Sequence, residues 1–136
     1  VAIIGAGGIG FDVAEFLTQS GESATLHPAE WRREWGVGDP AVVAGGLAEA
    51  TPEPSPREVW LLQRKAEKPG RGLGKTTGWI HRAALQARGV RMLGGVSYGR
   101  ITAEGLVITR NGIEELLAVD DVVLCAGQLP ERRLAA

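Results

Sequence analysis

The 136-residue sequence is poor in cysteine, methionine and aromatic residues, and it has no strong excess of charge of either sign. Its single cysteine, Cys125, excludes an internal disulfide and favours a reducing, cytoplasmic compartment. Lysine and arginine number 15 against 16 acidic residues, whereas a nucleic-acid-binding domain usually has a basic surface. No run of about 18 apolar residues occurs, so no membrane span is predicted.

What is present is typical of a folded domain. Hydrophobic residues make up 44% and charged residues 23%, which excludes an intrinsically disordered chain. Twenty glycines without a collagen period predict many tight turns. The length suits one domain over residues 1–136. Because the sequence opens on Val1 without methionine or a signal segment, we expect a piece of a longer protein.

The first 57 residues predict a strand, a helix and an irregular insertion. Residues 1–4 are wholly apolar, as in a buried parallel strand. Beyond the glycines that follow, the spacing of the apolar residues predicts one helical face, formed by Ile9, Val13, Phe16 and Leu17. Five prolines then interrupt residues 21–57, where a short helix is expected around Trp31 and Trp35. We expect these two tryptophans to anchor the insertion onto the domain rather than bind a ligand.

The rest of the chain predicts further alternation of strands and helices. A strand at 58–63, a helix at 79–88 closed by Gly89, and a strand at 90–93 come first. Strands near 97–103, 105–110 and 114–119 follow, and Asn111-Gly112 predicts a type I′ hairpin turn between the last two. A closing strand is expected at 121–125. The predicted fold is therefore α/β: a Rossmann-like dinucleotide-binding domain with a parallel core sheet plus a β-meander.

The first functional motif is a G-x-G-x-x-G string between the first strand and the first helix. In a dinucleotide-binding turn, the first glycine permits the tight turn and the second lets the backbone approach a pyrophosphate. The third lets the helix pack closely on the strand. The helix N-terminus then binds the phosphates. The string comprises Gly5, Ala6, Gly7, Gly8, Ile9 and Gly10.

The second motif is Gln63-Arg64-Lys65 at the end of the second strand, where Arg64 and Lys65 form a basic pair at the strand tip. In a Rossmann domain this tip faces the adenosine ribose, where an acidic residue accepts from the 2′-hydroxyl of NAD and a basic one accommodates the 2′-phosphate of NADP. The pair therefore favours NADP. No acidic residue stands at the tip itself, since Glu67 is two residues further on, in the loop.

Other candidates have weaker support. Gly74-Lys75-Thr76 resembles the end of a P-loop, but Pro69 stands where that motif needs glycine. A P-loop is therefore not expected, but Lys75, Thr76 and Thr77 are expected to line the cofactor cleft. His27 and His81 have no acidic partner at a recognisable spacing and are expected to be surface or packing residues. Cys125 is expected to be a small core residue of the last strand.

Three stretches resemble bacterial NADPH-dependent 2,4-dienoyl-CoA reductase, of the old-yellow-enzyme and trimethylamine-dehydrogenase-like flavoproteins. They are VAIIGAGGIGFDVAEFL at 1–17, LQRKAEKPGRGLGKTTGWIHR at 62–82 and VDDVVLCAGQLP at 119–130, with GVSYGRI at 95–101 in addition. The glycine string is common to many flavoproteins. The KPGRGLGKTTGWIHR block is far more particular.

The resemblance implies the NADPH-binding domain of a larger enzyme. That enzyme would also have an FAD domain and a barrel with FMN and a 4Fe-4S cluster, and these parts of the same chain would be the partners of this domain. Hydride would pass from NADPH to FAD, and electrons would then pass through the cluster to FMN, which reduces the dienoyl-CoA in fatty acid metabolism. With one cysteine, the chain lacks the four ligands of such a cluster.

The resemblance also assigns residues. It places the glycine string at the pyrophosphate and Arg64 with Lys65 at the 2′-phosphate. It places Asp12 near the nicotinamide carboxamide, and Ala126 with Gly127 at the closing turn beside the cofactor. Two other readings remain open: another enoate or amine oxidoreductase of the same flavoprotein group, and a non-catalytic NADP-sensing module. Neither a nucleic acid nor a membrane is expected as a partner.

Overall fold

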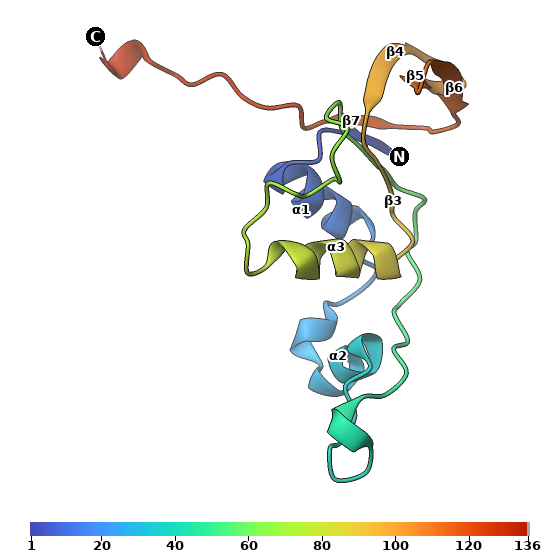
Figure 1. The fold of residues 1–136 in the computed structure, drawn as a ribbon, viewed down its shortest axis with the longest axis vertical. Coiled ribbons are helices and arrows are strands. Elements are labelled where there is room, and N and C mark those ends of the chain that lie inside the picture. Colours follow the sequence, from blue (N-terminus) through green and yellow to red (C-terminus); the bar gives the residue numbers. More distant parts are fainter. Residues whose placement is uncertain (136) are drawn as a thin grey trace.

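The computed structural model describes residues 1–135. Two helices, a parallel sheet and a second, antiparallel sheet form three layers, and the 21–57 segment and the C-terminal segment extend away from them (Figure 1). A four-stranded sheet has the order β3-β2-β1-β7, and a separate three-stranded sheet has the order β4-β5-β6. In chain order the elements are β1 (Ala2–Ile4), α1 (Gly8–Leu17), the 3-10 helix η1 (Ala24–Leu26), α2 (Pro28–Trp35), the 3-10 helix η2 (Ala44–Gly46), β2 (Trp60–Leu62), α3 (Gly78–Ala87), β3 (Arg91–Leu93), β4 (Val96–Thr102), β5 (Gly105–Arg110), β6 (Ile113–Leu117), β7 (Val122–Leu124) and the 3-10 helix η3 (Arg133–Ala135).

All pairings in the four-stranded sheet are parallel, as predicted. Ile3 of β1 lies opposite Leu61 of β2 on one side and Val123 of β7 on the other. β1 is therefore an inner strand with both faces covered, which explains why it is wholly apolar. The predicted α/β class, with a parallel core sheet and a β-meander, is confirmed.

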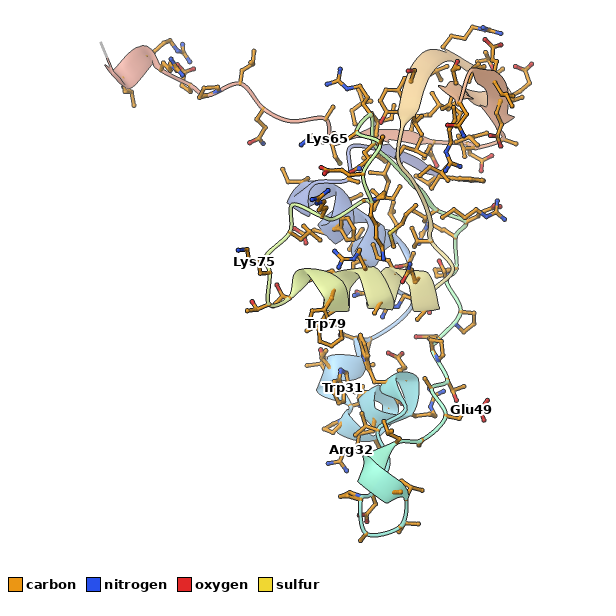
Figure 2. All side chains as sticks on the ribbon, in the orientation of Figure 1. Trp31, Arg32, Glu49, Lys65, Lys75 and Trp79 are labelled. Carbon is orange, nitrogen blue, oxygen red and sulfur yellow. The ribbon has the colours of Figure 1, made fainter. Side chains whose placement is uncertain are left out.

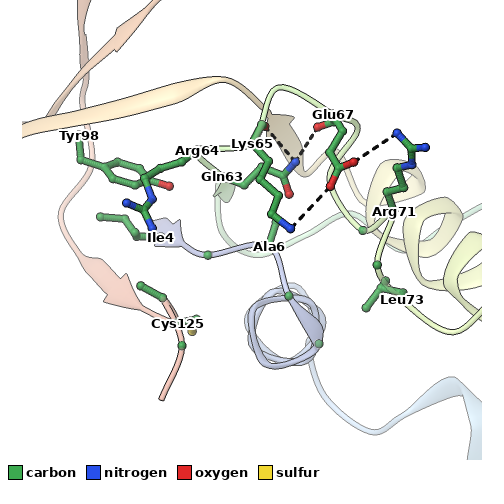
Figure 3. A pocket seen from close by; sticks show the side chains of 17 residues that line it. Ile4, Ala6, Gln63, Arg64, Lys65, Glu67, Arg71, Leu73, Tyr98 and Cys125 are labelled. Carbon is green, nitrogen blue, oxygen red and sulfur yellow. Dashed lines mark hydrogen bonds and ion pairs between the residues drawn. The ribbon is translucent and has the colours of Figure 1, made fainter. Parts of the chain in front are cut away.

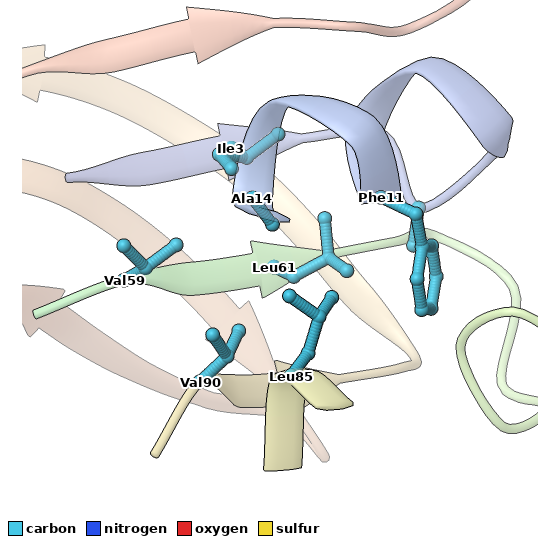
Figure 4. Packing of buried hydrophobic residues seen from close by; sticks show 8 residues of the cluster. Ile3, Phe11, Ala14, Val59, Leu61, Leu85 and Val90 are labelled. Atoms are coloured by element: carbon cyan, nitrogen blue, oxygen red, sulfur yellow. The ribbon is translucent and has the colours of Figure 1, made fainter. Parts of the chain in front are cut away.

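Alternate residues of the parallel strands supply two separate cores, because successive side chains of a strand point to opposite faces. Ile3 and Leu61 face the helices, where they pack with Phe11 and Ala14 of α1 and Leu85 of α3 (Figure 4). On the opposite face, a second buried cluster joins the sheet to the meander. It contains Ala2, Ile4, Leu62, Val96, Leu106, Ile108 and Leu117.

The predicted apolar face of α1 is correct in part: Val13 and Leu17 pack against the buried core, but the buried side of the helix is rotated by about a quarter turn from the prediction. Ile9 is 53% exposed and Phe16 is 75% exposed, whereas Phe11 and Ala14 are buried. The helix must bring Gly10 against the first turn, and Phe11 next to it then fills the space under the 70–73 loop. Close packing at the glycine, rather than the largest apolar stripe, therefore determines the rotation of α1.

The meander confirms the predicted hairpin. Asn111 and Gly112 have φ values of 53° and 78°, as a type I′ turn requires. The return strand β6 begins one residue earlier and ends two residues earlier than predicted. Gly89 after α3 also has a positive φ of 77°, in agreement with its predicted place at the helix end.

The 21–57 segment is more regular than predicted, since it contains α2 and two short 3-10 helices. It extends from the domain beyond α3 (Figure 1). The rings of Trp31 and Trp35 lie with centroids 6.2 Å apart. Trp35 faces Ala84 and Ala87 of α3 across a cavity of about 180 Å³. Trp31 does not line this cavity, so Trp35 is the tryptophan that lies toward α3 there.

Candidate functional site

The carboxyl ends of β1, β2 and β7 meet at one edge of the parallel sheet, and a cavity of about 380 Å³ opens there. Ligands of open α/β sheets bind at this edge. Three stretches far apart in the sequence form its walls, together with Tyr98 of the meander (Figure 3). The lining residues are 4–8, 63–65, 67, 70–73, 98 and 125–127.

The first and last glycines of the glycine string form the turn itself. Gly5 has a φ of 116°, and a Cβ there would overlap the carbonyl oxygen of Cys125. A Cβ on Gly10 would overlap the carbonyl oxygen of Gly5 and stand 3.4 Å from Leu61 Cδ1. Only glycine therefore allows β1, α1 and the closing turn to approach so closely.

The middle glycines of the string face open space instead. A Cβ on Gly7 or Gly8 would meet nothing within 4 Å, and both residues line the cavity. In the described part of the chain, no protein acceptor takes the amide hydrogen of either residue; the first bond of the helix runs from the amide of Phe11 to Gly7. Unpaired amides at the start of a helix bind anions such as phosphates. This arrangement fits a pyrophosphate.

The basic tip after β2 reaches the same cavity. Arg64 and Lys65 both line it and are exposed. The backbone of the tip is fixed by Gln63, whose Nε2 donates to the carbonyls of Lys65 at 3.1 Å and Glu67 at 2.6 Å. The amide of Gly95 also donates to the carbonyl of Lys65, at 2.9 Å. Hydrogen bonds therefore hold the backbone of the tip in a bend.

Glu67, Arg71 and Tyr98 also line the cavity, although the sequence did not predict them as site residues. Glu67 lies 3.9 Å from Lys65 Nζ and 3.3 Å from Arg71 Nη1 (Figure 3). Tyr98 comes from β4, on the other sheet, and lies beside Arg64. Burial raises the pKa of the Tyr98 phenol above 10.0, and the positive charge of Arg64 opposes this rise. No sequence spacing predicts Tyr98 here, because the packing of two sheets places it.

The structure separates the predicted site residues into two groups. One group lines the cavity: Gly5, Ala6, Gly7, Gly8, Arg64, Lys65, Ala126 and Gly127. The other does not: Ile9, Gly10 and Asp12. Gly10 acts through packing, while Ile9 and Asp12 are exposed on α1 beyond the turn. The placement of Asp12 beside a nicotinamide carboxamide remains a prediction.

Other expectations need correction. Lys75, Thr76 and Thr77 do not line the cavity, since the loop passes it at 70–73 and then turns toward α3 (Figure 2). Cys125 packs against the core on the helix side of the sheet, as expected, but it follows β7 instead of lying within it. It is also only half-buried and lines the cavity.

The two histidines also differ from expectation, because both have carboxylate partners. His27 Nε2 lies 2.8 Å from Glu22 Oε2, and His81 Nδ1 lies 3.6 Å from Glu15 Oε2. The second pair joins α3 to α1, a proximity that sequence spacing does not reveal. Both histidines are partly exposed, as expected of surface residues.

Fold and site together define a Rossmann-type dinucleotide-binding domain. A family model described as "Pyridine nucleotide-disulphide oxidoreductase" matches residues 1–136, and the chain belongs to this family of oxidoreductases, which bind NAD(P) and FAD.

Two solved structures share the fold. A 2-naphthoyl-CoA reductase in complex with 2-naphthoyl-CoA aligns with a TM-score of 0.61 at 17% identity, over 98% of this chain and 15% of that one. An engineered water-forming NADPH oxidase bound to NADPH aligns with a TM-score of 0.51 at 19% identity, over 98% of this chain and 22% of that one. The chain thus spans less than a quarter of either protein.

Among residues 1–135, no three histidine, cysteine or acidic side chains are grouped in a way that could hold a metal ion. In the same range, no helix has the length and apolar character needed to cross a bilayer.

Proposed function

We propose that this chain is the NADPH-binding module of a flavoprotein oxidoreductase. The observation that carries the proposal is the convergence of the glycine turn and the doubly basic tip on one cavity. These two features lie 54 residues apart in sequence, measured from Gly10 to Arg64. A cavity of about 380 Å³ is within the usual size range of small-molecule sites, roughly 300–1,000 Å³.

Each part of the nucleotide has residues suited to it. The free amides of Gly7 and Gly8 would bind the pyrophosphate, and the open space above them leaves room for it. The guanidinium of Arg64 and the ammonium of Lys65 would bind the 2′-phosphate. Ala126 and Gly127, after β7, would line the side of the cofactor opposite the basic tip.

We further propose that the parent enzyme reduces 2,4-dienoyl-CoA in the β-oxidation of unsaturated fatty acids. NADPH bound here would supply hydride to FAD in a neighbouring domain, with FMN and a 4Fe-4S cluster elsewhere in the parent. This assignment is supported by the resemblance of residues 62–82 to the dienoyl-CoA reductases. The shared fold with a CoA-ester reductase is compatible with it.

Calorimetric titration of the chain with NADPH and NADH tests the binding proposal. NADPH should bind more tightly than NADH, and Gly7→Val should abolish the binding of both while the circular dichroism spectrum stays unchanged. Equal affinity of the Gly7→Val variant and the unsubstituted chain for NADPH would show that the glycine turn does not face the cofactor.

The parent activity is tested separately. The chain alone should not reduce 2,4-dienoyl-CoA with NADPH, because flavin and cluster sites are expected elsewhere in the parent. The full-length parent should do so, and should prefer the dienoyl-CoA to simple enoates or amines. Turnover by the purified chain without an added flavoprotein would contradict the assignment of this chain as a nucleotide module.

A further inference from the structure

The cavity contains one acidic side chain among its basic ones. The Glu67 carboxylate reaches Arg71 at 3.3 Å and Lys65 at 3.9 Å, and its side chain is 36% exposed against 74% and 80% for those partners. Glu67 is therefore the least exposed member of this three-residue cluster. It lies in the loop after the strand tip and lines the same cavity as the tip, where a Rossmann domain distinguishes the two nicotinamide nucleotides.

The backbone holds Glu67 in this place. Its carbonyl accepts from Gln63 Nε2 at 2.6 Å. A Cβ on Gly94 would stand 2.6 Å from the same carbonyl oxygen, so the loop packs directly on the chain after β3. The carboxylate accordingly projects into the cavity from a bend whose backbone is held by hydrogen bonds and packing.

The two nucleotides would meet this carboxylate differently. A 2′-phosphate carries about 1.5–2 negative charges near neutral pH, so it would repel Glu67 and compete with it for Lys65. A 2′-hydroxyl is neutral and would donate a hydrogen bond to the carboxylate. The same residue thus acts against one nucleotide and for the other.

We propose that Glu67 is a specificity-determining residue whose charge reduces the preference of the site for NADPH over NADH. This inference rests on the proposed function, since it assumes that the adenosine ribose lies at the basic tip. It also revises the expectation that no acidic group is available to the ribose. A carboxylate five residues beyond the end of β2 occupies the cavity because the loop folds back.

The test measures both dissociation constants by calorimetry and compares their ratio, the Kd for NADH divided by the Kd for NADPH, between variants. Exposed charge pairs change an equilibrium constant by up to about fivefold. Glu67→Gln should therefore strengthen NADPH binding about threefold and weaken NADH binding about threefold, which raises the ratio about tenfold. Raising the salt concentration should reduce this difference.

Two further variants separate charge from shape. Glu67→Asp keeps the charge and should leave the ratio close to that of the unsubstituted chain. Glu114→Gln removes an exposed carboxylate that pairs with Arg100 at 3.5 Å in the meander, and it should leave the ratio unchanged. Thermal melting of each variant verifies that it is folded.

The outcomes are distinct. If the unsubstituted chain prefers NADPH but Glu67→Gln leaves the ratio unchanged, or alters both affinities equally, this inference is overturned and the proposed function stands. If the unsubstituted chain binds neither nucleotide, the proposed function fails and the inference fails with it.

Discussion

Replacing Arg64 and Lys65 together by alanine is expected to weaken NADPH binding about a hundredfold and to leave NADH binding nearly unchanged. A guanidinium presents a planar fork of donors to a phosphate, and a charge-assisted hydrogen bond contributes roughly 1.5–3 kcal/mol. The Lys65 side chain is 80% exposed and its Nζ already lies 3.9 Å from Glu67. Its contribution is therefore that of a surface pair, about 0.2–1 kcal/mol.

Together, the contributions of Arg64 and Lys65 are about 3 kcal/mol, which corresponds to roughly a hundredfold change in the Kd for NADPH. The assay is calorimetric titration with both nucleotides at low and high salt, because screening should reduce the effect. Lys75→Ala serves as a control: it removes one positive charge, where the double variant removes two, and it lies outside the residues that line the cavity. It should change neither affinity.

This reasoning would be refuted if the double variant kept the same ratio of NADPH to NADH affinity as the unsubstituted chain. The strand tip would then not be the specificity site. Arg71 would be the next candidate, because it lines the same cavity and its Nη1 lies 3.3 Å from the Glu67 carboxylate.

Two further predictions concern the turn and the phenol. Gly10→Ala should destabilise the fold by about 1–3 kcal/mol in urea unfolding, because its Cβ would overlap the carbonyl oxygen of Gly5. The control variant Gly7→Val should leave the urea midpoint unchanged. Equal midpoints for the two variants would contradict the packing argument. Because burial raises the pKa of Tyr98, the single tyrosine should ionise above pH 10.0 in an absorbance titration, and in Arg64→Ala at a still higher pH. The stability that the neutral phenol contributes is complete below the unfolded pKa of about 10 and is lost as the pH rises through the pKa in the folded state. Tyr98→Phe should therefore reduce the fall in stability above pH 10. A titration midpoint of the Tyr98 phenol at or below pH 10.0 would contradict its burial.

Local pattern was enough to predict most of the architecture. Wholly apolar runs marked the inner parallel strands, and Asn111-Gly112 marked the hairpin, because each depends on residues adjacent in sequence. The glycine string predicted its own strand-to-helix turn for the same reason. The buried face of α1 was predicted only in part, at Val13 and Leu17, because its rotation depends on what Gly10 and Phe11 contact across the fold.

The alternation of strands and helices, the glycine turn and the basic tip follow from the sequence alone, because backbone propensity and side-chain period are local properties. Which residues share the cavity depends instead on tertiary packing. It brought Tyr98 from another sheet beside Arg64, folded Glu67 back toward Lys65, and directed the loop away from the cavity before Lys75. These contacts join positions whose separation in sequence carries no periodic signal, and the packing of the two sheets and the loop alone sets their distances.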